Sequence, residues 1–435
     1  MLNGRLPIRD RKVAQPLAMK ILVLIWEFPP RLIGGIARHG AELYPELVKL
    51  GHEIHLITVE FSQAPAKEII EGIYVHRVPV AGFSQDIINW IDNMNDSMSR
   101  YGAKLIGRNP DFDLIHAHDW MVADTAILLK EKFQIPIVAT IHATEFGRHN
   151  GIHNPSSEHV HSHEIRLVEA AQQTIVCSQY MRQEVGQILH CPWERISIIY
   201  NGIRPEKKQR PKDFDFWAFR RRFATDREQI IYYVGRMTYE KGIFVLLNAA
   251  PKILWELGGN AKLIFIGGGN TDGLKQQARD LGIWEKCFFT GFMSDEDLDR
   301  FQTVADCAVF PSLYEPFGIV ALESFAARVP VVVSDAGGLA EVVRHTKTGI
   351  VTWRWDCNSL AWGILEVLKN PGYAKWLTDN AYDELGKRFN WAKIAIQTET
   401  VYNTALIKTN QSISQLGGRW SSILAGKSLI HCRFE

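Results

Sequence analysis

Short apolar runs alternate with longer amphipathic segments along most of the chain. The first run, at 20–25, has the length of a strand, and 37–50 follows it with apolar residues at helical spacing. Further strands are predicted at 53–58, 72–78, 114–116, 137–140, 174–176 and 196–199. Strands that alternate with helices pair in parallel, with helices on both faces of the sheet. This half of the chain is therefore predicted to be a doubly wound α/β domain.

A second series of the same kind follows. Its strands are predicted at 230–234, 262–266, 287–289, 308–310, 330–333 and 349–351. The segment between the two series, 203–227, is rich in charged residues and proline and is typical of a linker. The predicted fold class is thus α/β, with two doubly wound domains.

Composition and charge narrow the classes of function. The 435 residues are 46% hydrophobic and 22% charged, as in a soluble globular protein. The 49 basic and 48 acidic residues leave a net charge of +1, so no basic field favours nucleic acid or an anionic membrane. No apolar run approaches the roughly 18 residues that a membrane span needs. We expect no transmembrane segment, whereas peripheral contact with a membrane stays open.

The N-terminal segment and the cysteines indicate the compartment. Segment 1–18 carries four basic residues but no apolar stretch follows them, so it is interpreted as a flexible leader and not as a secretory signal. The six cysteines lie far apart without a C-x-x-C pair, which fits a reducing compartment and argues against a zinc site. A cytoplasmic protein is predicted.

The end of the first strand is the first candidate binding element. Open α/β sheets bind ligands beyond the carboxyl ends of their strands. Gly34 and Gly35 lie there, at the start of the helix at 37–50, where paired glycines let a ligand approach the backbone. A tight strand-to-helix turn without a ligand is the alternative.

Arg236 and Lys241 hold the corresponding place in the second series, between a strand and a helix. A guanidinium offers a fork to two oxygens, and an ammonium adds a mobile point charge, so the pair suits a diphosphate. A solvated basic turn is the alternative.

Segment 311–323 carries two carboxylates around a predicted helix start. Glu315 precedes the helix, which is expected from about Gly318, and Glu323 lies more than a turn inside it. The free amides of a first helical turn can meet an anion, so the carboxylates would bind hydroxyls on either side of a phosphate. Ordinary surface glutamates are the alternative. A carboxylate pair for glycoside hydrolysis is disfavoured, because a basic diphosphate site has no place in that chemistry.

Glu315 and Glu323, around Pro-Phe-Gly, resemble the paired-glutamate motif of the retaining GT-B glycosyltransferases of family 4. The resemblance extends from about Met19 to Leu406 and implies two Rossmann-like domains that face each other across a cleft. It places Arg236 and Lys241 on the donor diphosphate, Glu315 on the sugar and Glu323 on the ribose. The donor-binding residues that it implies are Gly34, Gly35, Arg236, Lys241, Phe292, Phe317, Gly318, Ile319, Val320 and Glu323.

The resemblance also implies the domain boundaries. We expect a leader at 1–18, an acceptor-side domain at 19–203, a linker at 204–228 and a nucleotide-sugar domain at 229–388. A helix at 389–410 is expected to cross back to the N-terminal domain, followed by a tail at 411–435. Arg204 departs from the family pattern, in which an acidic residue commonly follows Asn201-Gly202, and we expect its effect to be confined to the linker.

Two motifs are similar to the glycogen and starch synthase-like branch of the family: 116–120 (His-Ala-His-Asp-Trp) and 27–30 (Glu-Phe-Pro-Pro). His142 matches the position whose histidine lies beside the donor sugar in that branch. Acceptor-side roles are expected for His118, Asp119, Glu145 and Arg148. The alternative for His118 and His142 is an ordinary hydrogen-bonded loop histidine.

Two other motifs are weaker. Histidines crowd one stretch, but glycine and proline interrupt any single helical face there, so a polar acceptor-side loop is preferred to a zinc site; they are His149, His153, His159, His161 and His163. The glycines at 267–273 nearly form a dinucleotide fingerprint, but their spacing and the missing acidic residue after the next strand disfavour a nicotinamide cofactor.

The resemblance thus predicts a retaining glycosyltransferase that moves a hexosyl group, glucose in the first instance, from UDP- or ADP-glucose to a hydroxyl acceptor such as an α-glucan. The catalytic set is His142, Arg236, Lys241 and Glu315. Because fixed cations and helix amides can stabilise the leaving diphosphate, no metal cofactor is expected. The alternatives are a nucleotide-sugar 2-epimerase of the same fold, a transferase with a lipid or exopolysaccharide acceptor, and a catalytically weak binding protein.

Overall fold

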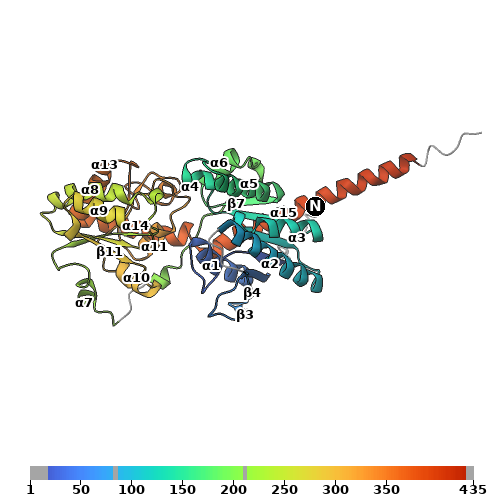
Figure 1. Ribbon diagram of the computed structural model, residues 1–435, viewed down its shortest axis with the longest axis horizontal. Helices are drawn as coiled ribbons and strands as arrows, with labels where there is room; N and C mark the ends of the chain where they lie inside the picture. Colours follow the sequence, from blue (N-terminus) through green and yellow to red (C-terminus); the bar gives the residue numbers. More distant parts are fainter. Residues whose placement is uncertain (1–17, 82–86, 209–212, 428–435) are drawn as a thin grey trace, which may run out of the picture.

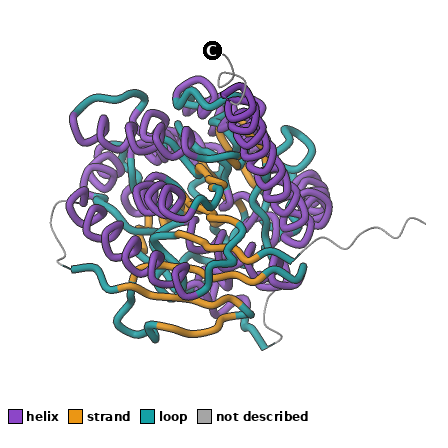
Figure 2. The backbone as a smooth tube through the Cα atoms, turned by 90° about the vertical axis from the view of Figure 1, so that its right-hand side faces the viewer, coloured by secondary structure: helices purple, strands orange, loops and turns teal. Residues whose placement is uncertain are grey.

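The computed structural model describes residues 18–81, 87–208 and 213–427, and from 410 onward only the backbone. It contains two lobes side by side, each a sheet with helices on both faces (Figures 1 and 2). Parallel strands buried on both faces read as continuous apolar runs, and for that reason the hydrophobic pattern locates most of them.

The N-terminal sheet has the order β3-β4-β2-β1-β5-β6-β7-β8, with all neighbours parallel except β3 and β4. Its strands are β1 Lys20–Leu24, β2 Glu53–Val59, β3 Lys67–Ile70, β4 Ile73–Val78, β5 Leu114–His118, β6 Ile137–Ile141, β7 Gln173–Val176 and β8 Ile196–Ile198. The antiparallel edge strand β3 was not predicted, because its four residues are half exposed and carry no apolar run.

Helices cover this sheet on both sides (Figure 2). They are α1 Gly35–Lys49, α2 Ile87–Arg108, α3 Ala123–Phe133, α4 Glu145–His149, α5 Pro155–Ala170 and α6 Gln179–Ile188.

The C-terminal sheet is entirely parallel, with the order β11-β10-β9-β12-β13-β14. Its strands are β9 Gln229–Val234, β10 Ala261–Ile266, β11 Cys287–Gly291, β12 Cys307–Phe310, β13 Val331–Ser334 and β14 Ile350–Thr352. Its helices are α8 Ile243–Glu256, α9 Asp272–Asp280, α10 Asp295–Gln302, α11 Ile319–Ala326, α12 Leu339–Val342, α13 Cys357–Lys369 and α14 Pro371–Arg388. The segment expected as a linker holds a short helix, α7 Phe216–Arg220.

Strand order places a switch point in each domain. β1 lies between β2 and β5, and β9 lies between β10 and β12, so the chain leaves β1 and β9 where the order reverses. Ligands of open sheets bind at such points, beyond the carboxyl ends of the strands. The loops after β1 and β9 are those that carry Gly34-Gly35 and Arg236 to Lys241.

The last helix, α15 Trp391–Lys427, crosses from the C-terminal lobe to the N-terminal lobe and then projects beyond it (Figure 1). Its buried face joins the core of the N-terminal sheet and includes Trp391, Ile394, Ala395, Val401, Tyr402 and Ala405. The helix continues past 410, so much of the segment expected as a tail is helical.

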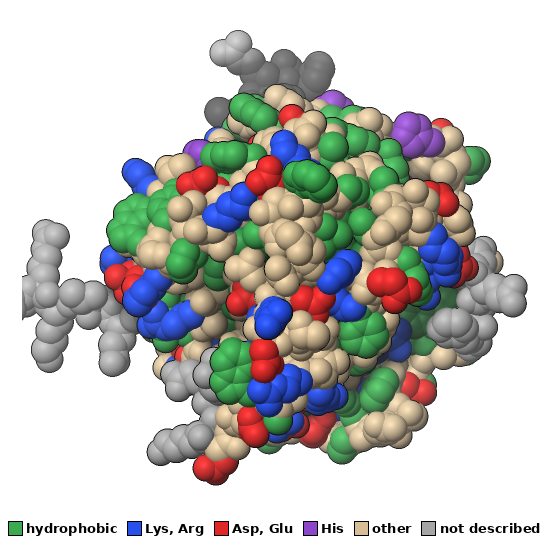
Figure 3. All heavy atoms as spheres, turned by 90° about the vertical axis from the view of Figure 1, so that its left-hand side faces the viewer, with side chains coloured by type: hydrophobic (Ala, Val, Ile, Leu, Met, Phe, Trp, Pro, Cys, Tyr) green, Lys and Arg blue, Asp and Glu red, His purple; other side chains and the backbone are tan. Residues whose placement is uncertain are grey.

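Figure 3 shows the charged side chains on one outer face of the molecule. Acidic and basic side chains are interspersed over this outer face of the C-terminal lobe, and no field of one sign stands out. None of the described helices is both long and apolar enough to span a membrane.

Candidate donor pocket between the domains

A cavity of about 260 Å³ lies between the two domains, at the carboxyl ends of both sheets. The N-terminal domain contributes Gly35, Ile36, His142, Ala143, Arg148, Cys177 and Asn201. The C-terminal domain contributes residues 233–236, Glu240, Lys241, Phe310, Ser312, Tyr314 and residues 315–320. Most of the residues expected to bind the donor therefore face one space, together with His142 and Arg148.

Lys241 and Glu315 form an ion pair that lines this cavity. The Lys241 ammonium donates to Glu315 Oε2 at 2.7 Å, and the two side chains are only 17% and 14% exposed. Ser312 Oγ lies 3.4 Å from the same carboxylate oxygen. The Arg236 side chain is more exposed, at 56%, and its guanidinium pairs with Glu240 at 3.3 Å. The cations are thus partly neutralised and face the cavity from one side.

Glycines let the two C-terminal loops come together. Gly242 has φ +64°, and a Cβ there would lie 2.0 Å from the carbonyl oxygen of Pro311. Gly318 also has positive φ (101°) and immediately precedes α11. No side chain caps the start of α11, so the first amides of the helix are open to an anion in the cavity.

His142 enters the cavity from the end of β6 and is held from behind. Its Nε2 lies 3.0 Å from Nδ1 of His118, and its backbone amide donates to Asp119 at 2.7 Å. Burial lowers the pKa of His142 to about 3 and raises the pKa of Asp119 to about 6. His142 is therefore a neutral imidazole that can donate or accept a hydrogen bond.

His118 and Asp119 do not line the cavity, contrary to the acceptor-side expectation. His118 is fully buried and also contacts the Tyr44 hydroxyl, and Asp119 is 4% exposed with φ 59°. The pattern of two histidines at a strand end could not distinguish a residue in the cavity from one that supports it.

Glu323 lies on the far side of the α11 start from Glu315. It lines a second cavity, of about 290 Å³, together with Arg38, His39, Asp295 and Asp299. Ile319 lines both cavities and so separates them. Glu323 Oε1 accepts a 2.6 Å hydrogen bond from Arg38 of α1, and its side chain is only 6% exposed. The two glutamates occupy two adjoining compartments, one on each side of the helix N-terminus.

Like His118 and Asp119, three further predicted residues lie outside both cavities. Phe292 is 84% exposed in the loop after β11. Gly34 donates its amide to Glu27 at 2.9 Å instead of facing the space. Glu145 pairs with His149 at 3.0 Å, whereas its neighbour Arg148 does line the first cavity.

Two functional-site residues were missed. Glu27 is 1% exposed, and its carboxylate accepts hydrogen bonds from the amides of Ile33, Gly34 and Ala37. It shapes the glycine loop, and the available signal was its place in the motif 27–30, which was interpreted only as a mark of the family branch. Arg38 carried no signal, because its partners come from the other domain.

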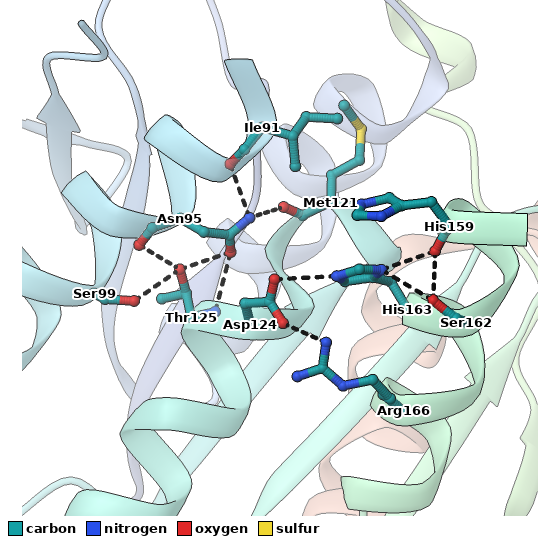
Figure 4. Close-up of polar contacts among 10 residues, drawn as sticks. All are labelled: Ile91, Asn95, Ser99, Met121, Asp124, Thr125, His159, Ser162, His163 and Arg166. Carbon is teal, nitrogen blue, oxygen red and sulfur yellow. Dashed lines mark hydrogen bonds and ion pairs between the residues drawn. The ribbon is translucent and has the colours of Figure 1, made fainter. Parts of the chain in front are cut away.

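The crowded histidines do not gather around one point. His153 bonds the carbonyl of His149. His163 instead bonds Asp124 at 3.2 Å, and Asp124 also pairs with Arg166 at 2.8 Å (Figure 4). Beside them, Asn95 and Thr125 join α2 to α3 through hydrogen bonds of their own (Figure 4). The contacts of Asp124 fasten α3 to α5. His159, His161 and His163 lie on the continuous helix α5 and not on the polar loop that was expected, because Asn154 caps the helix and Pro155 occupies its first turn.

A different trio, His39, His118 and His142, has ring nitrogens within 4.8 Å of one another. His118 and His142 already share a hydrogen bond, and His39 Nδ1 bonds Asn201 at 2.8 Å. A metal at this point would have to replace the bond between the first two rings.

Comparison with known proteins places the chain among sugar transferases. The family model for glycosyl transferases group 1 matches residues 215–384, and the family model for glycosyltransferase family 4 matches residues 33–207. An uncharacterised glycosyltransferase of Methanocaldococcus jannaschii is 38% identical over 398 residues, covering 89% of this chain and 99% of the relative. The glycogen synthase of Mycobacterium tuberculosis is 34% identical over 405 residues, covering 89% and 95%.

Solved structures confirm the predicted GT-B fold. Sucrose-phosphate synthase from Thermosynechococcus elongatus superposes with a TM-score of 0.77 at 22% identity, covering 90% of this chain and 100% of that one. The Anabaena protein HepE in complex with UDP-glucose gives 0.69 at 20% identity, covering 91% and 100%.

Proposed function

The chain belongs to the group 1 glycosyltransferases of family 4, and from this premise we propose that it transfers a glucosyl group from a nucleoside diphosphate glucose to a carbohydrate hydroxyl with retention of configuration. The observation that carries the proposal is the first cavity, where Lys241, Glu315 and the open start of α11 face His142. The UDP-glucose bound by HepE and the name glycogen synthase in a 34% identical relative support the donor and the acceptor class.

In this proposal the diphosphate lies against Lys241, Arg236 and the first amides of α11. Negative charge develops on the leaving phosphate as the glycosidic bond breaks, and fixed cations and amides in a confined space stabilise it without reorganisation. Glu315 lies beside Lys241 at 2.7 Å, so it reaches the sugar attached to that phosphate. The ribose extends past Ile319 to Glu323 in the second cavity.

The acceptor approaches from the N-terminal domain, where His142 and Arg148 line the cavity. Because burial keeps His142 neutral, we assign to it a hydrogen bond with a sugar hydroxyl and not the role of a proton-carrying base. The acceptor proton then passes to a donor phosphate oxygen on the same face of the sugar, and retention follows.

A donor-by-acceptor screen with Lys241→Ala as the reference variant tests the proposal. Loss of one preorganised charge typically lowers turnover by about a hundredfold or more, and we expect that loss here. Lys252→Ala, an exposed lysine of α8, is the matched control. Turnover of the nucleotide sugar without any acceptor, to an isomer, would identify an epimerase instead. Activity in EDTA is expected to persist.

A further inference from the structure

Three aromatic side chains form a contiguous surface cluster on the C-terminal domain, which we call the aromatic platform: Tyr239, Phe244 and Trp355. The rings of Tyr239 and Phe244 stack with centroids 5.3 Å apart and planes at 17°. Trp355 lies 6.0 Å from Tyr239 and 5.7 Å from Phe244. Tyr239 is 70% exposed and Trp355 55% exposed, so the platform leaves large ring faces in solvent. Exposed apolar groups that gather in one place mark interaction sites more often than scattered ones do.

The backbone of Trp355 adds an independent observation. Its φ is +67°, in the left-handed region, where a bulky side chain is a genuine outlier. Such strain costs on the order of 1 kcal/mol and persists where the surroundings or a function impose it. Burial does not explain it, because more than half of this tryptophan faces solvent. The strained turn instead presents an indole ring outward, beside Tyr239.

The platform adjoins the first cavity, in which we place the donor. Tyr239 belongs to the turn Tyr239–Lys241 after β9, and its two successors, Glu240 and Lys241, line that cavity. Trp355 follows β14, and β9 and β14 belong to the same parallel sheet, so both loops leave the same carboxyl edge. That is the edge where α/β sheets bind ligands.

Charge around the platform is compensated. Arg236 pairs with Glu240 at 3.3 Å, and Arg354 pairs with Asp335 at 3.2 Å. Arg236 and Lys241 line the first cavity, and the platform itself consists of three uncharged aromatic rings. The surface therefore suits an uncharged ligand that combines apolar faces with hydroxyl groups.

We propose that the aromatic platform of Tyr239, Phe244 and Trp355 is a glycan-binding subsite that holds a distant part of a polysaccharide acceptor while its end occupies the donor cavity. Pyranose rings fit such a surface, since their C–H faces pack on aromatic rings and their hydroxyls reach the flanking polar groups. This inference rests on the proposed function, because it presumes a carbohydrate acceptor.

A second attachment point acts through effective concentration. A polymer bound at the platform presents its ends near the cavity at a local concentration that can reach the millimolar range. The platform should therefore lower the KM for a long acceptor and matter little for an acceptor too short to span both places.

Binding and kinetics of the full chain test the proposal. Affinity electrophoresis through gels with glycogen, laminarin or galactomannan reports polysaccharide binding without any turnover. We expect retardation by at least one of these polymers and loss of most of it in Trp355→Ala and Tyr239→Ala. Trp255→Ala is the matched control, because Trp255 lies at the far end of the same helix α8 as Phe244 and is 84% exposed without belonging to the platform. It should migrate like the parent protein, and thermal melts check that every variant is folded.

Kinetics add a measurement that a loss of structure would not give. With the retarding polymer as acceptor, Trp355→Ala should raise KM about tenfold, and with a trisaccharide of the same linkage it should raise KM far less. Failure of all three polymers to retard the parent protein would overturn the platform, as would equal retardation of the parent and Trp355→Ala. Binding to neutral phosphatidylcholine vesicles that is lost in Trp355→Ala would overturn it in favour of a lipid surface. Calorimetry with UDP and ADP reports separately on the proposed function, because the donor site binds them whether or not the platform binds glycans.

Discussion

At the scale of single residues, the two glutamates around α11 differ in the cation that holds them. Glu315 is held by Lys241 of its own domain at 2.7 Å, and Glu323 by Arg38 of the other domain at 2.6 Å. Glu315 lies in the cavity with His142, whereas Glu323 lies beyond Ile319. Unequal positions along the donor imply unequal kinetic roles.

We expect Glu315→Gln mainly to lower kcat and Glu323→Gln mainly to raise the KM of the donor. A group beside the reacting sugar can interact more strongly in the transition state, and a group on the ribose contributes about equally in ground and transition states. Initial rates at saturating acceptor and varied donor separate the two constants. A loss of kcat alone in Glu323→Gln, together with a loss of donor affinity alone in Glu315→Gln, would reverse the two roles.

Neither of these ion pairs was predicted, but the approach of one pair follows from the predicted fold class and that of the other does not. Lys241 and Glu315 each follow a strand at the same sheet edge, so their approach follows from the fold class. Arg38 and Glu323 are 285 positions apart and meet only because the two domains close on each other. Hydrophobic periodicity describes the inside of a domain and carries no information on the angle between domains.

At the scale of elements, a chain of buried histidines follows the ends of β5 and β6. His116, His118, His142 and His39 lie side by side, and the hydroxyls of Tyr44 and Tyr402 bond His116 at 3.0 and 2.7 Å. Burial lowers the pKa of His39 and of His142 to about 3, and it lowers the pKa of His116 and His118 well below the ordinary value. The folded protein keeps these rings neutral.

Acid is therefore expected to destabilise the protein from about pH 6.5 downward. An unfolded histidine takes up a proton near pH 6.5, whereas the folded ring does so only near its lower pKa, so each ring costs about 1.4 kcal/mol per pH unit within that interval. Asp119 and Glu164 act in the opposite direction, because burial raises their pKa to about 6 and about 8, and they offset part of the slope. Denaturant unfolding from pH 7 to pH 4 measures the slope of the free energy of unfolding against pH.

A substitution in the chain should change the slope and not only the stability. His118→Asn removes one ring that must remain neutral, so its free energy of unfolding should fall less steeply with acid than that of the parent. Thr400→Ala, at an exposed position of α15, removes no titratable group and is the control that should keep the parent slope. Equal slopes in all three proteins would show that the buried rings do not govern acid stability.

Helix α15 ties the C-terminal end of the chain into the N-terminal core through Tyr402. This side chain is fully buried, and its hydroxyl lies 2.7 Å from His116. Tyr402→Ala should lower the free energy of unfolding by about 3–5 kcal/mol, as is typical when a large aromatic side chain is removed from a core. Tyr402→Phe should cost about 1 kcal/mol for the lost hydrogen bond.

The control for this helix is Thr400→Ala, on the exposed face of α15, which should change stability by no more than about 0.5 kcal/mol. Denaturant titration followed by circular dichroism compares the variants. If Tyr402→Ala lowered the free energy of unfolding as little as Thr400→Ala does, the packing of α15 would contribute little to the stability of the domain.

Prediction of the elements succeeded where burial is two-sided and failed where it is not. The strands at 230–234 and 262–266 agree with β9 and β10 to within one residue, because both faces of the sheet are covered. Strand β3 was not predicted because it is a half-exposed edge strand. The C-terminal end of α15 was not predicted because the family pattern, which predicted a helix that crosses back to the N-terminal domain, ends near Leu406. The helix itself continues to Lys427.

At the scale of the whole molecule, contacts on two sides of the first cavity hold the domains together. On one side, Tyr314 donates to Glu184 at 2.8 Å, and the Glu341 carboxylate accepts the amides of Gln179 and Tyr180 at 2.8 Å each. On the other side, Arg38 of α1 reaches the C-terminal domain. The cavity thus depends on the relative placement of the two domains.

Arg38 is the bridge that a donor would disturb. It bonds Glu323 and Asp295 at 2.6 Å each, and Glu323 is the carboxylate to which we assign the ribose. The ribose hydroxyls and the guanidinium therefore compete for the same carboxylate oxygens. Arg38 holds the domains together before the donor binds. When the donor binds, the ion pair between Arg38 and Glu323 must break so that the ribose can reach the carboxylate.

Arg38→Ala should therefore change binding and turnover in opposite directions. Removal of the competitor should tighten UDP or ADP binding about fivefold, which corresponds to about 1 kcal/mol for a partly exposed ion pair. Turnover should fall, because the closed arrangement of the domains becomes less populated. Calorimetry measures the affinity, and small-angle scattering without nucleotide should give a larger radius of gyration. Arg300→Ala is the matched control, since Arg300 pairs with Glu296 and Asp297 of its own helix α10. Weaker nucleotide binding in Arg38→Ala would mean that Arg38 contacts the donor itself, and the competition would be wrong.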